Sequence, residues 1–249
     1  MAIDEALLVA AVAAGPHATP SLRLYLWRRP TLSLGHHQRQ LPHRWRPALE
    51  RGAVDLVRRP SGGRAVLHAG ELTYALIWPQ APQRRSDAYR LACAWLQAAF
   101  AAMDQPLVFG CQAATGERSS CFATSTAADL VHLNGAKRIG SAQLWRGGCL
   151  LQHGSILVDP PAALWWELFD HGPPPVPGLP LEGSDLIAHL RCSAERHWPA
   201  LWGRELLQEP LTPGERAEIR CRRLSYGLPA TTWDPFGATS PAATMPRAT

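Results

Sequence analysis

Lysine is nearly absent from this chain of 249 residues. Its 25 basic residues comprise 24 arginines and a single lysine, Lys137, although lysine is normally among the commonest residues. Arginine can replace lysine where only a charge or a solvated stem is needed, but its guanidinium is larger, planar and never deprotonated. A lysine that has not been replaced therefore indicates a place that needs a compact ammonium group. The alternative is that one lysine has survived by chance.

Long apolar runs and a secretory signal are also absent from the sequence. No stretch of about 18 apolar residues occurs, so a membrane-spanning helix is not expected. The apolar stretch 6–14 follows two acidic residues, Asp4 and Glu5, instead of the basic segment that opens a secretory signal. We therefore expect a cytoplasmic protein whose cysteines are reduced thiols.

Cysteine pairs of the C-x-x-C kind are missing too. The six cysteines are Cys93, Cys111, Cys121, Cys149, Cys192 and Cys221. Their spacing argues against a zinc ribbon or a thioredoxin-type redox centre, and no metal site is expected. Most of these cysteines should be small buried side chains, and at most one or two should be chemically special.

The remaining composition is that of a globular protein. A hydrophobic content of 46% excludes disorder over most of the length, and the length fits one large domain or two small ones. A net charge of +5 and a pI near 9.1 suit an acidic partner. Because the arginines are scattered, with no basic stripe interleaved with aromatic residues, a nucleic-acid partner is not expected.

The spacing of apolar and turn-forming residues predicts an α+β fold with a mixed, largely antiparallel sheet flanked by helices. Helices are expected over 2–14, 86–103, 162–169, 184–202 and 213–222. Strands are expected over 22–27, 31–34, 54–57, 65–67, 72–78, 129–133, 137–145 and 149–158. Ser86 is the expected cap of the second helix, and the strands over 65–67 and 72–78 are expected to pair. Asn134–Gly135 predicts a tight hairpin.

The chain is expected to divide into three parts. Residues 1–170 form the sheet domain, and residues 171–224 form a Pro-rich linker with a helical C-terminal part. Residues 225–249 are rich in Pro, Ala, Thr and Gly, which predicts a disordered tail.

A glycine-rich segment between two of the predicted strands is the first candidate for chemistry. Gly62 and Gly63 would let backbone N–H groups approach an anion or an acyl carbonyl closely. The flanking Arg58, Arg59 and Arg64 could hold a phosphate or a carboxylate in a fork. The alternative is an ordinary hairpin turn, which is the commoner role of a Gly–Gly pair between strands.

Two further segments carry polar residues on predicted strands. Lys137 opens a strand directly after the Asn134–Gly135 turn, and its neighbour Arg138 already supplies a cation. A site that needs only charge would not need both, so we interpret Lys137 as a donor to an oxyanion or a carbonyl. His153 lies inside the next strand, where a histidine is more often a satisfied core residue than a catalyst.

Taken in order, these segments resemble the biotin/lipoate protein ligase superfamily. The segments that carry the resemblance are Met1–Ala6, Arg58–Gly63, Lys137 with Gly140–Gln143, and His153–Ser155. The resemblance covers residues 1–158. It implies an α/β sheet that holds a medium-chain acyl group, which makes residues 1–170 an acyl-binding catalytic domain. Members attach octanoyl or lipoyl groups to a lysine of a small acceptor domain. The implied substrate-binding residues are Arg58, Arg59, Ser61, Gly62, Gly63, Arg64, His68, Gly140, Ser141 and Ala142.

The superfamily contains two chemistries, which a cysteine distinguishes. Ligases pass through an acyl-adenylate and need ATP and Mg, whereas octanoyltransferases carry the acyl group on an enzyme cysteine and need no cofactor. Cys121–Phe122, sixteen residues before Lys137, resembles the Cys–Phe of cysteine-dependent octanoyltransferases. We therefore expect Cys121 to be the nucleophile, activated by nearby cations such as Lys137. Cys149 is the rival, although its apolar neighbours predict burial.

The resemblance implies a cycle of two steps. Cys121 attacks the octanoyl thioester of acyl carrier protein, while Lys137 and the Gly–Gly loop stabilise the oxyanion. The lysine of a lipoyl acceptor domain then attacks octanoyl–Cys121 and forms an amide. His153 and His68 are candidates for taking the amine proton, with His153 preferred. Arg58 and Arg59 would either steer the acidic carrier protein or hold the loop.

The sequence departs from the family pattern at three places. The residue after His68 is Ala69, where the family commonly has Asp, so a carboxylate beside His68 is not expected. The family has a strand before its first helix, so either the natural start lies upstream or an edge strand is missing. The region after Pro160 leaves little room for the accessory domain of some ligases, which favours a transferase. A ligase and a non-catalytic acyl- or biotinyl-binding relative remain the alternatives.

Overall fold

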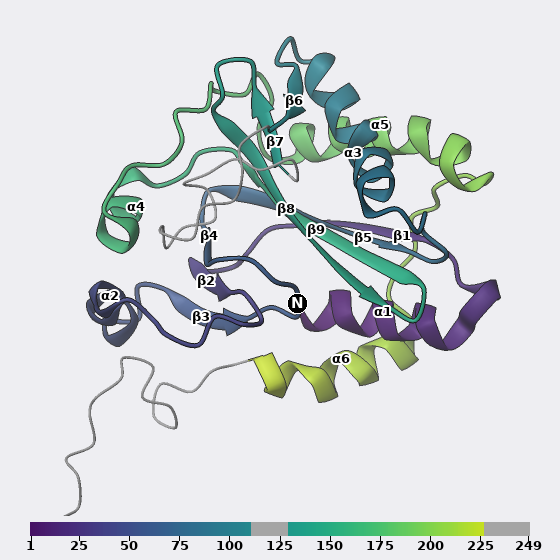
Figure 1. Ribbon diagram of the computed structural model, residues 1–249, viewed down its shortest axis with the longest axis horizontal. Coiled ribbons are helices and arrows are strands. Elements are labelled where there is room, and N and C mark those ends of the chain that lie inside the picture. The colour runs from purple at the N-terminus through teal and green to yellow at the C-terminus, as the bar shows by residue number, and fades with distance from the viewer. Residues whose placement is uncertain (111–128, 227–249) are drawn as a thin grey trace, which may run out of the picture.

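A six-stranded sheet forms the centre of the structure, a computed structural model that describes residues 1–110 and 129–226 (Figure 1). The strand order is β1-β5-β9-β8-β7-β6, and every neighbouring pair is antiparallel. The strands are β1 Ser21–Tyr25, β5 Glu71–Trp78, β6 Leu107–Phe109, β7 Asp129–His132, β8 Lys137–Arg146 and β9 Cys149–Leu157. The hairpin predicted at Asn134–Gly135 is confirmed, because β7 and β8 pair directly across it.

A second, three-stranded sheet lies beside the first. Its central strand β2, Thr31–Leu34, runs parallel to β3, Asp55–Arg58, and antiparallel to β4, Val66–His68. The mixed character that the sequence predicted is therefore confined to this small sheet, and the predicted α+β class is confirmed.

The predicted pairing of the strands over 65–67 and 72–78 is wrong. β4 pairs with β2, whereas β5 pairs with β1 and β9. Gly70 redirects the chain between them: it has a positive φ of 63°, and a Cβ there would lie 1.8 Å from the Asp159 carbonyl oxygen. Glycine alone fits this close approach, so the short link joins two sheets instead of closing a hairpin.

Helices cover both faces of the main sheet (Figure 1). On one face lies α1, Ala2–Ala14, whose Leu8 and Ala11 pack against β5 and β9. On the other face lie α3, Arg85–Ala101, and α5, Gly183–Trp202, which share a core with Leu72 of β5. The remaining helical segments are α2 Arg46–Glu50, α4 Ala162–Phe169, α6 Pro213–Tyr226 and the short 3₁₀ turns Gly15–His17 and His43–Trp45.

All five predicted helices are present, although α3 ends at Ala101 and α6 runs on to Tyr226; α2 was not predicted, and one predicted cap is wrong. The residue before α3 is Arg84, and no side chain caps this end of the helix. Ser86 lies inside the first turn instead. The helix begins one residue earlier than expected because Arg85 already has helical geometry, and Asp87 in the first turn suits the positive end of the helix dipole.

The C-terminal helices pack against the sheet domain. Leu186 and Leu190 of α5 belong to the same core as α3, and Ser193 donates a hydrogen bond of 2.7 Å to the Trp95 carbonyl. α6 runs beside α1, where Tyr226 and Glu5 form a hydrogen bond (Figure 1). The tail predicted from residue 225 lies outside the described residues from 227 onward. None of the helices in the described ranges combines the length and the apolar character that a membrane span needs.

A buried polar network lies on the α3 side of the main sheet. Tyr74 and Ser141 share a hydrogen bond of 2.7 Å between their hydroxyl oxygens, and the Gln152 amide donates to the Tyr74 oxygen at 3.0 Å. Gln143 donates to Gln152 at 2.8 Å. Gly154 lies beneath this network, where an added Cβ would be 2.5 Å from the Tyr74 ring and 2.9 Å from the Gly140 carbonyl oxygen. The network needs a glycine at this point of β9.

Candidate active site

A cavity of about 240 Å³ lies on the α1 face of the main sheet, beside the small sheet. Its floor is formed by Gly140 and Ala142 of β8 and by His153 and Ser155 of β9, which face each other in register. These residues alternate with those that point toward α3, as the pleat of a strand requires. The Gly62–Gly63 loop forms the opposite wall. The cavity is small compared with the roughly 300–1,000 Å³ of sites for drug-sized ligands.

Arg59 holds the glycine loop in place, and Arg58 binds a neighbouring segment of backbone. Arg59 is buried, and its guanidinium donates to the Gly62 carbonyl at 2.8 Å, the Arg64 carbonyl at 2.6 Å and the Ser33 carbonyl at 2.8 Å. Arg58 donates to the Gly35 carbonyl at 3.0 Å. Of the two roles predicted for these arginines, the contacts of Arg59 support holding the Gly62–Gly63 loop, whereas those of Arg58 lie in the segment 35–38.

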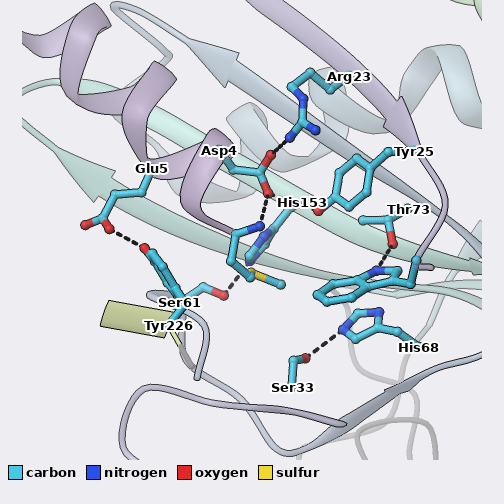
Figure 2. Close-up of polar contacts among 12 residues, drawn as sticks. Asp4, Glu5, Arg23, Tyr25, Ser33, Ser61, His68, Thr73, His153 and Tyr226 are labelled. Atoms are coloured by element: carbon cyan, nitrogen blue, oxygen red, sulfur yellow. Dashed lines mark hydrogen bonds and ion pairs between the residues drawn. The ribbon is translucent and has the colours of Figure 1, made fainter. Parts of the chain in front are cut away.

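His153 lies in the cavity floor with Ser61 behind it. Its Nε2 and the Ser61 oxygen are 2.5 Å apart (Figure 2). Complete burial lowers the pKa of His153 from 6.5 to about 3, with Asp4 opposing the shift and Arg59 adding to it. The imidazole is therefore neutral near physiological pH.

Asp4 of α1 is a buried carboxylate that sequence reasoning did not single out, although it lies within the Met1–Ala6 segment. Its side chain accepts hydrogen bonds from Arg23 and from the Tyr25 hydroxyl, the latter at 3.0 Å (Figure 2). Burial opposes ionisation, but the surrounding positive charges, Arg23 among them, hold the pKa of Asp4 below its usual range. The only sequence signal was an acidic residue in the first turn of a helix.

His68 lies at the end of β4 with polar partners on both ring nitrogens. Its Nδ1 is 2.6 Å from Glu71 Oε1, and its Nε2 is 2.7 Å from Ser33 Oγ (Figure 2 draws the second contact). Trp27 stacks on the ring with centroids 4.2 Å apart. The expectation that His68 lacks a carboxylate is wrong. Glu71 supplies one from across the Gly70 turn, in place of the missing Asp at position 69.

Lys137 and Arg138 have separate surroundings. Lys137 is 4% exposed, and its Nζ lies 2.9 Å from Asp129 Oδ1. Arg138 is fully buried and donates to the Leu157 carbonyl at 2.7 Å and to the Pro177 carbonyl, so it fastens the Pro-rich segment to the sheet. This arrangement agrees with the inference that Lys137 and Arg138 have different roles. A carbonyl-binding role for Lys137 stays a prediction.

The predicted nucleophile Cys121 and its neighbours lie outside the described residues. Its rival Cys149 is buried among apolar residues of α1 and β9, and burial raises the pKa of its thiol. Burial raises the pKa of Cys93 further, to about 12. Neither thiol has the electropositive, accessible surroundings that a reactive cysteine needs. The described parts of the chain hold no cluster of metal-binding side chains.

The structure brings most of the predicted site residues together. The cavity wall contains these predicted residues: Arg59, Gly62, Gly63, His68, Gly140, Ser141, Ala142 and His153. Ser61 lies directly behind His153. Arg58, Arg64 and Lys137 are not among the described residues that line the cavity. Sequence reasoning missed Ser33, Thr73 and Ser155, which also line it, because hydroxyl residues inside strands carry no distinguishing pattern.

The sequence profile of the lipoyl protein ligase A/B catalytic domain matches residues 1–171. The chain belongs to this family. The match extends over α1, both sheets and the cavity between them, so the predicted superfamily resemblance is confirmed.

Within the lipoyl protein ligase A/B family, octanoyltransferases are similar to this chain in sequence. Octanoyltransferase LipM of Carboxydothermus hydrogenoformans is 39% identical over 163 residues, which cover 64% of this chain and 60% of that protein. The chain thus spans less than two thirds of this relative's length.

Two solved ligase structures share the fold. Lipoate-protein ligase A bound with ATP has a TM-score of 0.69 at 17% identity, covering 89% of this chain and 87% of that one. A bi-partite lipoate protein ligase from Thermoplasma acidophilum, described with its E2 lipoyl domain, has a TM-score of 0.66 at 14% identity, covering 89% and 85%. At these identities the likeness shows the fold alone.

Proposed function

We propose that this chain is a protein N-octanoyltransferase of lipoate assembly. It moves an octanoyl group from acyl carrier protein, through a thioester on the enzyme, to the lysine of a lipoyl acceptor domain. The observation that carries the proposal is the small cavity between the Gly62–Gly63 loop and the floor formed by Gly140 and Ala142. Walls of glycine and alanine leave room for a thin acyl chain. The similarity to an octanoyltransferase supports the same activity.

The proposed first step is thioester exchange onto Cys121. The exchange is nearly balanced in energy and needs no ATP, but it needs a thiolate, which suits the reducing cytoplasm. Lys137 and the backbone of the Gly62–Gly63 loop stabilise the oxyanion. The role of Cys121 rests on its Cys–Phe sequence, because the residue lies outside the described structure.

In the second step the acceptor lysine attacks the thioester, and its nitrogen loses a proton. A good proton acceptor has a pKa near the working pH. With a pKa of about 3, His153 is a weak acceptor. The proposal therefore moves this role from His153 to His68. His153 instead forms part of the cavity floor beside Ser61.

Transfer measured without ATP tests the proposal. The protein is incubated with octanoyl–acyl carrier protein and a lipoyl domain, and octanoylation of the domain is followed by mass spectrometry. We expect transfer by the wild type, none by Cys121→Ser, and an octanoyl adduct on Cys121. Cys149→Ser is the matched control and should transfer normally. Transfer that requires ATP would identify a ligase, and no transfer with or without ATP would identify a binding protein. An octanoyl adduct on Cys149 would show that Cys149, and not Cys121, is the nucleophile.

A charge-conserving replacement tests the role of Lys137. Lys137→Arg keeps the net charge, but a guanidinium does not fit an ammonium-sized site, so most transfer activity should be lost. Because Lys137 is buried against Asp129, circular dichroism must first show that the variant folds. Near-normal transfer by the folded variant would mean that Lys137 is not needed at the carbonyl.

The ligase alternative keeps one observation in its favour. ATP-dependent ligases share this fold, as the structure of lipoate-protein ligase A with ATP shows. The fold therefore does not separate the two chemistries, and the ATP requirement of the assay decides between them.

A further inference from the structure

Three side chains in and beside the cavity form a continuous hydrogen-bonded line. Ser33 of β2 lies 2.7 Å from His68 Nε2, and Glu71 of β5 lies 2.6 Å from His68 Nδ1. All three side chains are buried, and Ser33 and His68 line the cavity. The line brings together two sheets, because β2 and β4 belong to the small sheet and β5 to the main one.

The direction of the hydrogen bonds follows from the chemistry of the end groups. A carboxylate only accepts, so Nδ1 of His68 carries the proton and donates to Glu71. In the neutral ring Nε2 is then unprotonated and accepts from the Ser33 hydroxyl. Arg59 donates to the same Ser33 oxygen at 3.2 Å, which leaves the serine proton directed at His68. The three groups are therefore arranged as in a catalytic triad. Ser33 supplies the hydroxyl, His68 is the base that takes its proton, and Glu71 orients the base.

Further contacts fix Glu71 and the ring of His68. Thr73 donates to Glu71 Oε1 at 2.6 Å and accepts from the Trp27 indole at 2.9 Å. Trp27 in turn stacks on His68 with an angle of 19° between the rings (Figure 2). The second carboxylate oxygen of Glu71 finds no partner in the described residues. A carboxylate buried so deeply is costly unless a positive charge develops beside it, and a protonated His68 would be that charge.

We propose that Ser33, His68 and Glu71 form a proton relay for the second step of octanoyl transfer, in which Glu71 is a positioning residue. The inference rests on the proposed function. The acceptor amine enters uncharged and attacks the carbonyl carbon of octanoyl–Cys121. The N–C bond forms, the C–S bond breaks, and Cys121 leaves as a thiolate. The proton lost by the nitrogen passes to Ser33 Oγ as the serine proton passes to His68 Nε2. His68 then releases its extra proton to solvent, and Cys121 remains the thiolate that the next thioester exchange requires.

Three charged or titratable groups face His68 or its partner Ser33. Glu71 faces His68 from β5, Arg59 reaches Ser33 from β3, and His153 faces His68 from β9. Of these three groups, Glu71 carries a negative charge, Arg59 a positive charge, and His153 is neutral. Removal of the Glu71 charge should therefore make His68 a weaker base, and the transfer rate should then fall at a lower pH than in the wild type.

The relay is tested by measuring the two steps separately. Octanoyl-enzyme formation is followed by mass spectrometry, and transfer from the preformed octanoyl-enzyme to a lipoyl domain is followed in a single turnover at several pH values. We expect Glu71→Gln and Ser33→Ala to slow transfer from the octanoyl-enzyme far more than its formation. Transfer should slow roughly 10²-fold, the usual contribution of a general base. In Glu71→Gln the acid limb of the transfer rate should also move to lower pH.

A matched control separates catalysis from folding. Ser193→Ala removes an equally buried hydroxyl on α5, which bonds a backbone carbonyl far from the cavity, and both steps should keep their wild-type rates. If one of the two relay variants fails to fold, the other decides the result.

Four outcomes would overturn the relay. The first is a relay variant whose transfer rate and pH profile both equal those of the wild type. The second is a relay variant that slows octanoyl-enzyme formation and transfer by the same factor. The third is an octanoyl ester on Ser33, stable where a thioester is cleaved by hydroxylamine. A wild type that forms no octanoyl-enzyme would instead overturn the proposed function itself, and the relay with it.

Discussion

Both faces of the main sheet carry buried polar side chains, but the side chains of the two faces differ in how completely they are hydrogen-bonded. On the α3 face, Tyr74, Ser141, Gln152 and Gln143 bond one another in a continuous chain, in which Ser141 and Gln143 also line the cavity. On the cavity face, the hydroxyl of Ser155 has no partner among the described residues, and neither has one oxygen of Glu71.

This difference separates structural from functional polar groups. A closed network contributes stability because each buried group has its partner, and losing one member leaves the others unpaired. A buried polar atom without a partner costs stability and calls for an explanation. Ser155 lines the cavity and Glu71 contacts His68, which also lines it, so a bound acyl group or a developing charge could meet both groups. The comparison predicts that variants of the α3 face change stability, while variants of the cavity face change activity.

The largest effect is expected from Gly154→Ala. The added methyl group would lie 2.5 Å from the Tyr74 ring, 2.6 Å from Ser141 Oγ and 2.9 Å from the Gly140 carbonyl. Backbone cannot move away cheaply, so we expect a loss of about 3 kcal/mol in the free energy of unfolding. Urea denaturation measures it, with Gly178→Ala as the control because no atom lies within 4 Å of that added methyl. A loss as small as that of the control would show that the closed network is loosely packed.

The next effect concerns pH and the cavity face. His153 has a pKa of about 3 when folded and an ordinary value of 6.5. The unfolded chain therefore binds a proton that the folded chain does not, and this contribution to stability falls as pH drops from 6.5 toward 3. Between pH 6 and pH 4 the wild type should lose about 2–3 kcal/mol more than His153→Gln. Urea titrations at both pH values measure this, and parallel losses would show that His153 is not buried in its neutral form.

Tyr74→Phe should have an intermediate effect. The variant keeps the ring but removes the hydroxyl that bonds Ser141 and Gln152. The groups left unpaired should reduce the free energy of unfolding by about 1–2 kcal/mol, measured by the same denaturation. A variant as stable as the wild type would remove the distinction between the two faces.

Ser155→Ala should have the smallest effect on stability. The serine hydroxyl has no partner to lose, so the free energy of unfolding should stay within about 0.5 kcal/mol of the wild type. Tyr74→Phe, which also removes one buried hydroxyl, is the direct comparison. A loss as large as that of Tyr74→Phe would indicate that Ser155 is bonded in solution and that the cavity face is closed as well.

Local patterns account for the elements that the sequence predicted well. The helix over 2–14 matches α1 residue for residue, because its apolar spacing is regular and Gly15–Pro16 ends it. The Asn134–Gly135 turn placed β7 against β8 in the same way. The four family segments located the cavity because each lies on an element that lines it or fixes its wall.

Contacts between distant segments account for what was missed. The pairing of β4 depends on the close approach of Gly70 to Asp159, eighty-nine residues away in the chain, which no local pattern records. The carboxylate of His68 was sought at the next residue, whereas the turn at Gly70 brings it from Glu71. Asp129 as the partner of Lys137 likewise depends on the register of β7 against β8.

The burial of Lys137 has a consequence for an enzyme that would carry a reactive thioester. Such a thioester can acylate any accessible lysine amine, including those of the enzyme that holds it. Here the sole lysine of the chain is 4% exposed and paired with Asp129, and all other basic side chains are arginine or histidine. Guanidinium groups stay protonated and are poor acyl acceptors. The chain thus carries no exposed lysine that the thioester could acylate.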